Sequence, residues 1–389
     1  NDVNIGAAVT ISESGIEASG IGITCASING TQIGGRRNLI INGAMNVAQR
    51  STSVAVSDGT NEGYQSLDRY KTYTNNSGAY TVSQDTDVPT DYSFGRFKNS
   101  YKVDVTTADT SIGSSDLIRV EQDIEAQDIA NSGWDYSSSS GKITLSFWVK
   151  SVKAGTYVVV IQTVDGTAYS YAIEYTLSAN TWTHVSKTIP GNSNLTIDDN
   201  NDAGLKIHWI LCSGSDNNLT AETWTSGLKY GTTNQANLFD STDNNWYLTG
   251  VQLEVGSQAT PFEHRSAGEE LALCQRYYYR VGLSGGTYYG GDLGIGFTDN
   301  DDTNIYVRTE FAVQMRAAPT AVEQTGDASE YKVRRDSTKT CSGVPTFSQA
   351  TAWAAKTNFP SSSHGWGTAA PVWGQTGNSD SFLAWSAEL

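Results

Sequence analysis

The strongest constraint on this chain is a series of short apolar-rich runs, several of which show a clear alternation of hydrophobic and polar residues. Eight runs of seven to eleven residues lie between Ser66 and Gly256, and polar, glycine-containing segments separate them. In the run Lys142–Ser151, one side consists of Ile143, Leu145, Phe147 and Val149. Because successive side chains of a β-strand point to opposite faces, this period of two predicts half-buried strands. Eight such strands joined by polar turns predict an antiparallel β-sandwich.

The composition agrees with an all-β chain. The 389 residues include 38 Gly and 20 Tyr but only 2 Met, and Ser, Thr and Asn crowd the segments between apolar runs. Gly, Asn and Ser supply the turn dihedrals that other residues resist. We therefore predict an all-β fold in four parts: an N-terminal intertwined β shaft (1–37), a central antiparallel β-sandwich (38–265), one short connecting helix (266–281) and a C-terminal β knob (282–389).

The first 37 residues differ from the rest because isolated β-branched residues stand among Gly, Ser and Thr. Isoleucines spaced in this way cannot bury themselves within one chain, but three copies wound around a common axis would bury them together. The residues that we expect at such an axis are Ile11, Ile16, Ile21, Ile23 and Ile28. We favour a trimeric shaft, and a flexible Gly/Ser-rich linker is the alternative.

The connecting segment carries the clearest helix signal. Ser266 followed by Glu269 forms a capping box, and Gly282 supplies a stop. Leu271, Cys274 and Tyr278 would fall on one side of this helix. We expect that side to pack under the next domain or against other copies of the chain.

The predicted knob begins with a second alternating run. In residues 304–315, one side consists of Ile305, Val307, Thr309 and Phe311. The segment SFLAWSAEL closes the chain. Residues Ser361–Ser381 are rich in Gly, Ser and Trp and are predicted to form a loop.

Three segments also resemble a known family. They are NLIINGAMNVAQR (38–50), IEAQDIANSGWDYSSSSGKITLSFWVKS (124–151) and WYLTGVQLEVGSQATPFEHRSAGEELALCQRYYYR (246–280). We interpret the first as an opening strand that contains an Asn-Gly turn, and the last as a closing strand, a turn and a helix. In this order they resemble the jelly-roll of fibre proteins of tailed bacteriophages, especially phages of aquatic bacteria.

The resemblance implies a sandwich of the jelly-roll type, which is shared with many carbohydrate-binding modules. The two ends of the chain also resemble the shafts and knobs of phage fibres. This implies a virion appendage that attaches to other virion proteins through its N-terminal segment and carries the knob outermost.

The net charge of −16 limits the partners. An acidic surface repels phosphate backbones, whose binding proteins draw most of their affinity from Lys and Arg. It also disfavours anionic lipid, and no apolar run approaches the ~18 residues that a membrane span needs. We therefore expect neither a nucleic-acid nor a membrane partner, whereas host glycans and protein surfaces stay open.

Residue patterns for catalysis and metal binding are scarce. The four histidines are isolated, and none stands in a metal-ligand spacing. Acidic clusters at Asp198–Asp202 and Asp299–Asp302 contain oxygen ligands of the kind that Ca²⁺ takes, but they lack the EF-hand spacing. We interpret both clusters as solvated turns, and expect no catalytic residue, no metal site, no cofactor and no enzymatic activity.

The four cysteines, Cys25, Cys212, Cys274 and Cys341, are far apart in the sequence. We expect buried free thiols, because small hydrophobic packing is the usual role of an unpaired cysteine. Free thiols suit assembly in the reducing cytoplasm of a bacterial host.

Aromatic residues supply the candidates for receptor contact, because Trp and Tyr stack on sugar faces. Core packing is the expected role of three tryptophans in predicted strands, namely Trp148, Trp182 and Trp209. Trp366 and Trp373 instead lie in the predicted loop, where exposed aromatic residues are better recognition candidates. We predict that both, with neighbouring His364, lie at the distal surface and bind the host; burial inside the knob is the alternative.

The leading functional hypothesis is a homotrimeric bacteriophage fibre, assembled into the virion and involved in recognition of the host surface. The first alternative is a structural head-decoration fibre or tail adaptor without a receptor. A polysaccharide depolymerase and a secreted carbohydrate-binding module are further alternatives.

Overall fold

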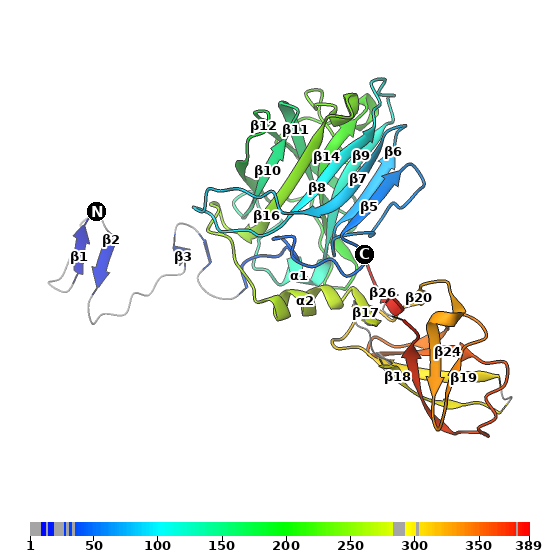
Figure 1. Cartoon of the computed structure of the whole chain (residues 1–389). Coiled ribbons are helices and arrows are strands. Elements are labelled where there is room, and N and C mark those ends of the chain that lie inside the picture. Colours follow the sequence, from blue (N-terminus) through cyan, green and yellow to red (C-terminus); the bar gives the residue numbers. More distant parts are fainter. Residues whose placement is uncertain are drawn as a thin grey trace.

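The computed structural model describes residues 9–12, 15–18, 27–28, 31–32, 36–282, 292–300, 303–378 and 380–389, with side chains from residue 36 onward. Strands dominate, and most of them form two lobes (Figure 1). The larger lobe contains β5 to β16, and the smaller lobe contains β17 to β26. The predicted all-β fold is confirmed.

The larger lobe is a sandwich of two six-stranded sheets in which every strand pairing is antiparallel. The first sheet runs in the order β13 (Thr183–Pro190), β10 (Lys142–Ser151), β16 (Asn245–Val255), β8 (Ser100–Thr107), β7 (Ala79–Asp85) and β5 (Ser53–Ser57). The second runs in the order β15 (Thr225–Ser226), β12 (Tyr169–Leu177), β11 (Gly155–Thr163), β14 (Ala203–Ser213), β9 (Leu117–Glu125) and β6 (Lys71–Asn75).

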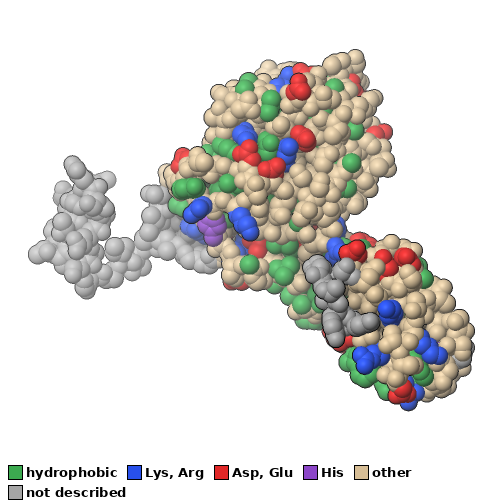
Figure 2. All heavy atoms as spheres, viewed as in Figure 1, with side chains coloured by type: hydrophobic (Ala, Val, Ile, Leu, Met, Phe, Trp, Pro, Cys, Tyr) green, Lys and Arg blue, Asp and Glu red, His purple; other side chains and the backbone are tan. Residues whose placement is uncertain are grey.

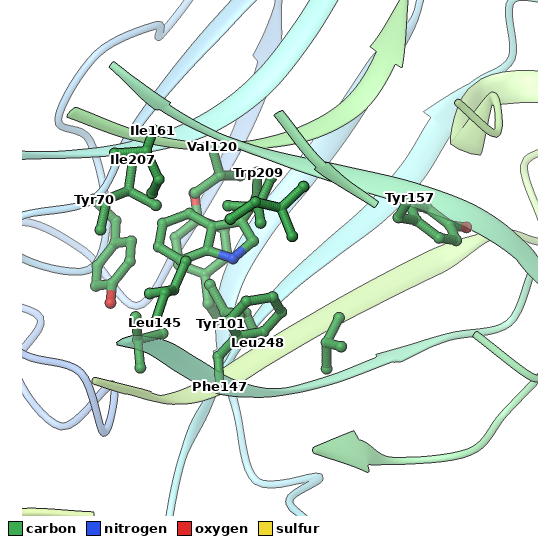
Figure 3. Packing of buried hydrophobic residues seen from close by; sticks show 14 of the residues in the cluster. Tyr70, Tyr101, Val120, Leu145, Phe147, Tyr157, Ile161, Ile207, Trp209 and Leu248 are labelled. Atoms are coloured by element: carbon green, nitrogen blue, oxygen red, sulfur yellow. The ribbon is translucent and has the colours of Figure 1, made fainter. Parts of the chain in front are cut away.

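The core of the larger lobe lies between these two sheets. Trp209 of β14 is fully buried, and Phe147 of β10 packs edge-on against it at 6.0 Å between ring centroids (Figure 3). The apolar side predicted for β10 is confirmed, because Ile143, Leu145, Phe147 and Val149 are all 0 % exposed. The strand is not half-buried, however, because most of its other side is buried as well. Burying such side chains stabilises the lobe by roughly 1.5–3 kcal/mol each.

The smaller lobe also consists of two sheets with a core of their own. The larger sheet runs in the order β22 (Thr338–Thr340), β21 (Tyr331–Arg334), β25 (Pro371–Thr376), β18 (Asp292–Thr298), β19 (Asn304–Glu310), β24 (Ala354–Pro360) and β23 (Thr346–Ala350). The smaller sheet contains β17 (Tyr278–Gly282), β26 (Phe382–Ser386) and β20 (Glu323–Gln324). Ile305, Val307, Thr309 and Phe311 are buried, which confirms the predicted alternation.

The loop predicted over Ser361–Ser381 is wrong in part, because β25 lies within it. Val372, Gly374 and Thr376 of this strand point inward, and β25 pairs with both β18 and β21. The strands that pair with β25 are far away in the sequence. The local Gly- and Trp-rich composition therefore predicts a loop, although the segment forms an interior strand.

The connecting helix is shorter than predicted. Helix α2 covers Ala267–Gln275 and has the expected capping box, but the chain becomes strand β17 at Tyr278 because this aromatic run pairs with β26. Its buried side is formed by Glu270 and Cys274, whereas Leu271 is 37 % exposed. The described residues also form helix α1 (Ala126–Ala130), which the sequence does not predict. Short 3₁₀ turns are formed by η1 (Ser215–Asn217), η2 (Leu238–Asp240) and η3 (Ala328–Glu330).

The opening strand predicted at 38–50 is not formed. Residues 41–45 make a compact turn in which Asn42 and Met45 have φ of 59° and 58°. The Asn42 side chain holds this turn by donating to the carbonyl oxygens of Val47 at 2.8 Å and Asp68 at 3.0 Å. Glycine is required at Gly43, because a side chain there would collide with the Val251 carbonyl.

The N-terminal segment is described only in short strands. β1 (Val9–Ser12) pairs with β2 (Gly15–Ala18), and β3 (Ser27–Ile28) pairs with β4 (Thr31–Gln32). Ile11 is in register with Ile16 across the first hairpin. The side chains of the predicted axis residues, and all of Ile21 and Ile23, lie outside the described residues, so the intertwined shaft stays a prediction.

Ionic contacts join the two lobes near the C-terminus. Glu388 forms ion pairs with Arg50 at 3.1 Å and with Arg69, whose side chain is 1 % exposed. Glu125 of the larger lobe accepts hydrogen bonds from Arg276 at 2.6 and 2.7 Å and from the Tyr277 hydroxyl at 2.5 Å. Figure 2 shows that the two lobes are in contact through a waist narrower than either of them.

Three cysteines, Cys212, Cys274 and Cys341, are free and buried as predicted, and Cys25 lies outside the described residues. Burial raises the pKa of the Cys212 and Cys341 thiols to about 12. They are therefore protonated and unreactive at neutral pH. Among the described helices, none has the length and apolarity needed to cross a membrane.

Candidate functional site

The large sheet of the smaller lobe turns one face to the core and the other to solvent. In β18, Ile295 and Phe297 are 60 % and 56 % exposed, whereas Gly296 and Thr298, which alternate with them, are buried. A register shift between Asp292 and Gly294 interrupts the alternation, so Leu293 is buried although it precedes Ile295 by two residues. In β25, Val372 is buried and Trp373 is 43 % exposed. The strand period of two therefore places these three large side chains on one outward face.

Cross-strand register brings the exposed side chains next to one another. Ile295 pairs with Trp373 on one side and with Arg308 on the other. The row continues from Arg308 to Lys356 and from Trp373 to Arg334. Because side chains opposite one another on neighbouring strands stand ~5 Å apart, the row Arg334–Trp373–Ile295–Arg308–Lys356 crosses five strands, about 20 Å in all.

A second row lies beside the first. Phe297 pairs with Pro371 of β25 and with Tyr306 of β19. The Lys356 ammonium lies 3.9 Å from the centre of the Tyr306 ring and makes a cation–π contact with it. We call the surface formed by Ile295, Phe297, Tyr306, Trp373, Arg308, Arg334 and Lys356 the aromatic face.

The aromatic face concentrates exposed apolar groups. Ile295, Phe297 and Trp373 are three of the eight large hydrophobic side chains that are exposed among the described residues. Single exposed hydrophobic residues are normal, but neighbouring ones mark binding surfaces. Figure 2 shows both hydrophobic and basic side chains on the visible surface of this lobe.

Two hollows lie along the row, on either side of Arg308. The first, about 450 Å³, is lined by Tyr279, Val281, Asp292, Leu293, Gly294, Ile295, Arg308, Thr309, Glu310 and Trp373. The second, about 360 Å³, is lined by Arg308, Gln349, Ala350, Thr351, Ala354, Ala355 and Lys356. The guanidinium of Arg308 donates from Nε to Glu310 at 2.6 Å, and this ion pair is more than 60 % exposed.

The three predicted receptor residues lie in different environments. Trp373 belongs to the aromatic face, in a strand rather than in a loop. Trp366 is partly buried against the core of the smaller lobe, with the Lys339 ammonium 5.2 Å from its ring centre. His364 is only 1 % exposed and stacks on Trp366 at 6.0 Å, so its ring is not presented to a ligand.

The three tryptophans that we expected in the core also differ in burial. Trp148 and Trp209 are buried at 4 % and 0 % exposure. Trp182 is half-buried immediately before β13 and donates from its indole nitrogen to Asp87 at 2.9 Å.

The densest group of titratable side chains lies on the outward face of the second sheet of the larger lobe. Glu121 accepts from Arg119 at 2.9 Å and lies 3.1 Å from His208. The Lys71 ammonium bridges Glu121 and Asp123 at 3.0 and 2.7 Å. We call Lys71, Arg119, Glu121, Asp123, Lys206 and His208 the Glu121 cluster.

The Glu121 cluster has divergent pKa values but no access for a substrate. Burial, followed by the charge of Glu121, raises the pKa of Asp123 to about 6. Burial opposes ionisation of Glu121 as well, but His208, Arg119 and Lys71 hold its pKa well below the usual range. Both carboxylates are about 1 % exposed beneath the lysines, so neither can act on a glycosidic bond as hydrolysis requires.

Metal binding has no support in the part of the chain that the structure describes, where no three His, Cys, Asp or Glu residues are grouped as ligands. Asp301 and Asp302 of the second acidic cluster lie outside that part.

Comparisons with known proteins give remote likenesses only. No family model matches the chain, and no curated protein matches it. A solved structure of the enzymatically active domain of tailspike protein 4 from bacteriophage CBA120 is 14 % identical, with 56 % of this chain aligned to 21 % of that chain at a TM-score of 0.29.

Carbohydrate-binding modules are also among the similar structures. A CBM4 structure is 14 % identical over 55 % of this chain and 97 % of its own, at a TM-score of 0.29. A family 11 module of the cellulosomal cellulase Lic26A-Cel5E from Clostridium thermocellum is 14 % identical over 53 % of this chain and 96 % of its own, at a TM-score of 0.27.

Proposed function

We propose that this chain is a homotrimeric, non-catalytic fibre protein of a tailed bacteriophage that binds a glycan of the host surface through the aromatic face. The observation that carries the binding role is the row in which Trp373 and Ile295 stand side by side and exposed between basic residues. Aromatic and aliphatic surfaces cover the apolar faces of sugar rings, while flanking polar groups bind the hydroxyls.

The virion setting is supported by the sequence. Three segments resemble the jelly-roll of phage fibres in the same order, and the isoleucines before residue 37 fit a shaft shared by three chains. In this proposal the N-terminal segment attaches to other virion proteins, and the smaller lobe lies on the host side.

Absence of catalysis is part of the proposal. The carboxylates with strongly shifted pKa values include Glu121 and Asp123, and lysine side chains close them off from solvent. Burial also raises the pKa of Asp68 to about 6, and this residue is only 1 % exposed. A site of this kind stabilises a sheet face, whereas glycan binding at the aromatic face needs no proton transfer.

The test is binding of the full chain to a panel of polysaccharides: dextran, a mixed-linkage β-glucan and polygalacturonate, measured by affinity electrophoresis. We expect at least one polymer to bind, and Trp373→Ala to weaken that binding at least tenfold, since one buried aromatic contact contributes about 1.4 kcal/mol or more.

The matched control is Tyr92→Ala. Tyr92 is 57 % exposed, comparable with Phe297, but it belongs to the larger lobe. Equal loss in both variants would attribute binding to general surface stickiness, and unchanged binding in Trp373→Ala would remove the aromatic face from the proposal.

A further inference from the structure

The aromatic face carries a local charge opposite to that of the whole chain. Four basic side chains point outward from its strands, namely Arg308, Arg334, Lys332 and Lys356. Two acidic residues stand among them, Glu310 beside Arg308 and Asp292 at the end of β18. The face therefore has an excess of two positive charges, on a chain whose net charge is −16.

Arg308 is the central cation of this surface. It stands between Ile295 and Lys356 in the row, and it lines both hollows. Glu310 accepts only from Nε, and within the described part of the chain the two terminal nitrogens have no hydrogen-bond partner. A guanidinium held in this way can still bind a carboxylate through its terminal nitrogens.

Whether the negative net charge of the chain prevents an anion from binding to the aromatic face depends on the distance between the charges and that face. At physiological ionic strength, exposed charges are largely screened beyond ~8 Å. Arg308 and Lys356 are cross-strand neighbours, ~5 Å apart, so both act on one ligand group within that length. The sign of the potential at such short range is therefore set by the charges of the face itself, where cations are in excess.

We propose that the aromatic face selects a carboxylate-bearing glycan, with an acidic sugar at Arg308 and Lys356 and a neighbouring sugar ring on Trp373 and Ile295. The inference rests on the proposed glycan-binding function and specifies its ligand class. The same positive excess disfavours a second copy of the chain packed face to face on this surface, because like charges would then meet across the interface.

The test compares polygalacturonate with its methyl ester, which has the same sugar backbone without charge. We expect the full chain to bind the acid form at least tenfold more tightly. Arg308→Gln combined with Lys356→Gln should remove about tenfold of affinity for the acid form and leave the ester unaffected, since hydrogen bonds to charged groups contribute more than neutral ones.

Two further variants separate this result from misfolding and from general charge effects. Glu310→Gln frees Arg308 from its competitor and should strengthen binding of the acid form, which no damaged fold would do. Lys98→Gln removes an exposed charge of the larger lobe and should change nothing.

The possible failures are distinct. Equal binding of acid and ester, or binding of a neutral polymer alone that still depends on Trp373, overturns the acidic-glycan inference and leaves the proposed function standing. Binding of no polymer overturns both. Self-association that depends on Trp373 and Arg308, measured by light scattering, would instead assign the face to a second copy of the chain.

Discussion

Removal of the Glu388 charge is expected to destabilise the junction between the two lobes. Glu388 forms ion pairs with Arg69 and Arg50, whose side chains are 1 % and 9 % exposed. Burial opposes the charge of Arg69, whereas Glu388 and neighbouring groups hold its pKa above the ordinary value. A guanidinium does not lose its proton in proteins, so Arg69 stays charged when Glu388 is replaced. Glu388→Gln keeps the shape of the side chain and leaves two buried guanidinium groups without their counter-ion.

The magnitude follows from burial. Breaking a buried ion pair from one side costs about 3–5 kcal/mol, whereas an exposed pair is worth 0–1 kcal/mol. Two cation–π contacts should lower the loss of stability in Glu388→Gln. The guanidinium carbon of Arg69 lies 3.5 Å from the ring centre of Tyr277, and that of Arg50 lies 3.6 Å from the ring centre of Tyr278. We therefore expect about 3 kcal/mol, the lower end of the range.

The assay is urea denaturation of the full chain, followed by circular dichroism. The matched control is Glu310→Gln, since the Arg308–Glu310 pair has a similar geometry but side chains 64 % and 67 % exposed. Arg69→Met added to Glu388→Gln should recover part of the loss by removing the orphaned charge. A Glu388→Gln loss no larger than that of the control would refute the reasoning.

Four further outcomes are expected. Light scattering should give three times 41.8 kDa, and Ile21→Asp with Ile23→Asp should weaken assembly by placing unpaired charges at the axis; a monodisperse wild-type monomer would contradict this. Incubation with polygalacturonate should release no reducing ends. Trp385→Ala, at 0 % exposure, should cost about 3–5 kcal/mol, and Trp373→Ala far less. Burial lowers the pKa of His208 to about 4 from its ordinary 6.5. Between these pH values the unfolded chain binds a proton that the folded chain does not, so the free energy of unfolding is unaffected by this group above pH 6.5 and declines by about 3 kcal/mol as the pH falls to 4. His208→Gln should reduce this decline in urea titrations.

Local periodicity was sufficient for most of the fold. The alternation in β19 identifies its buried side, because a period of two needs no knowledge of the partner strand. In β10 it identifies the side that faces the other sheet, but the opposite side is largely buried too. The Asn-Gly turn predicted within residues 38–50 is present at residues 41–45, but the strand around it is not, because hydrogen bonds from Asn42 to Val47 and Asp68 hold the segment in another conformation. Contacts of this kind are not visible in a local pattern.

The end of helix α2 shows the same limit. Ser266 and Glu269 mark its beginning within four residues of sequence, and the capping box is present. Its end is decided by Tyr278, which can extend a helical stripe or enter a sheet, and the partner that decides is β26 at the other end of the chain.

The candidate site was predictable in part. The sequence predicts Trp373 as a recognition candidate, but in a loop together with Trp366 and His364 rather than in a strand. Contacts with Lys339 and Arg335 turn Trp366 and His364 toward the lobe. Tyr306 and Arg308 carried a usable signal. Once Ile305 and Val307 are assigned to the core, Tyr306 and Arg308 must face solvent. An exposed aromatic side chain next to an exposed cation is unusual for the solvated side of a strand and indicates a binding surface.

Ile295 and Phe297 had no comparable signal, because glycines alternate with them in DLGIGFT and remove the hydrophobic contrast that marks a strand. A side chain at Gly296 would collide with the Tyr306 carbonyl, so the glycine that hides the pattern is also what lets β18 approach β19. The row that defines the aromatic face then depends on register among five strands from distant parts of the chain. Periodicity fixes which side of β19 and β25 is outward, and in β18 it does so only after the register shift between Asp292 and Gly294. Only the strand order makes Trp373, Ile295 and Arg308 neighbours, and the proposed ligand would be recognised by that neighbourhood rather than by any one residue.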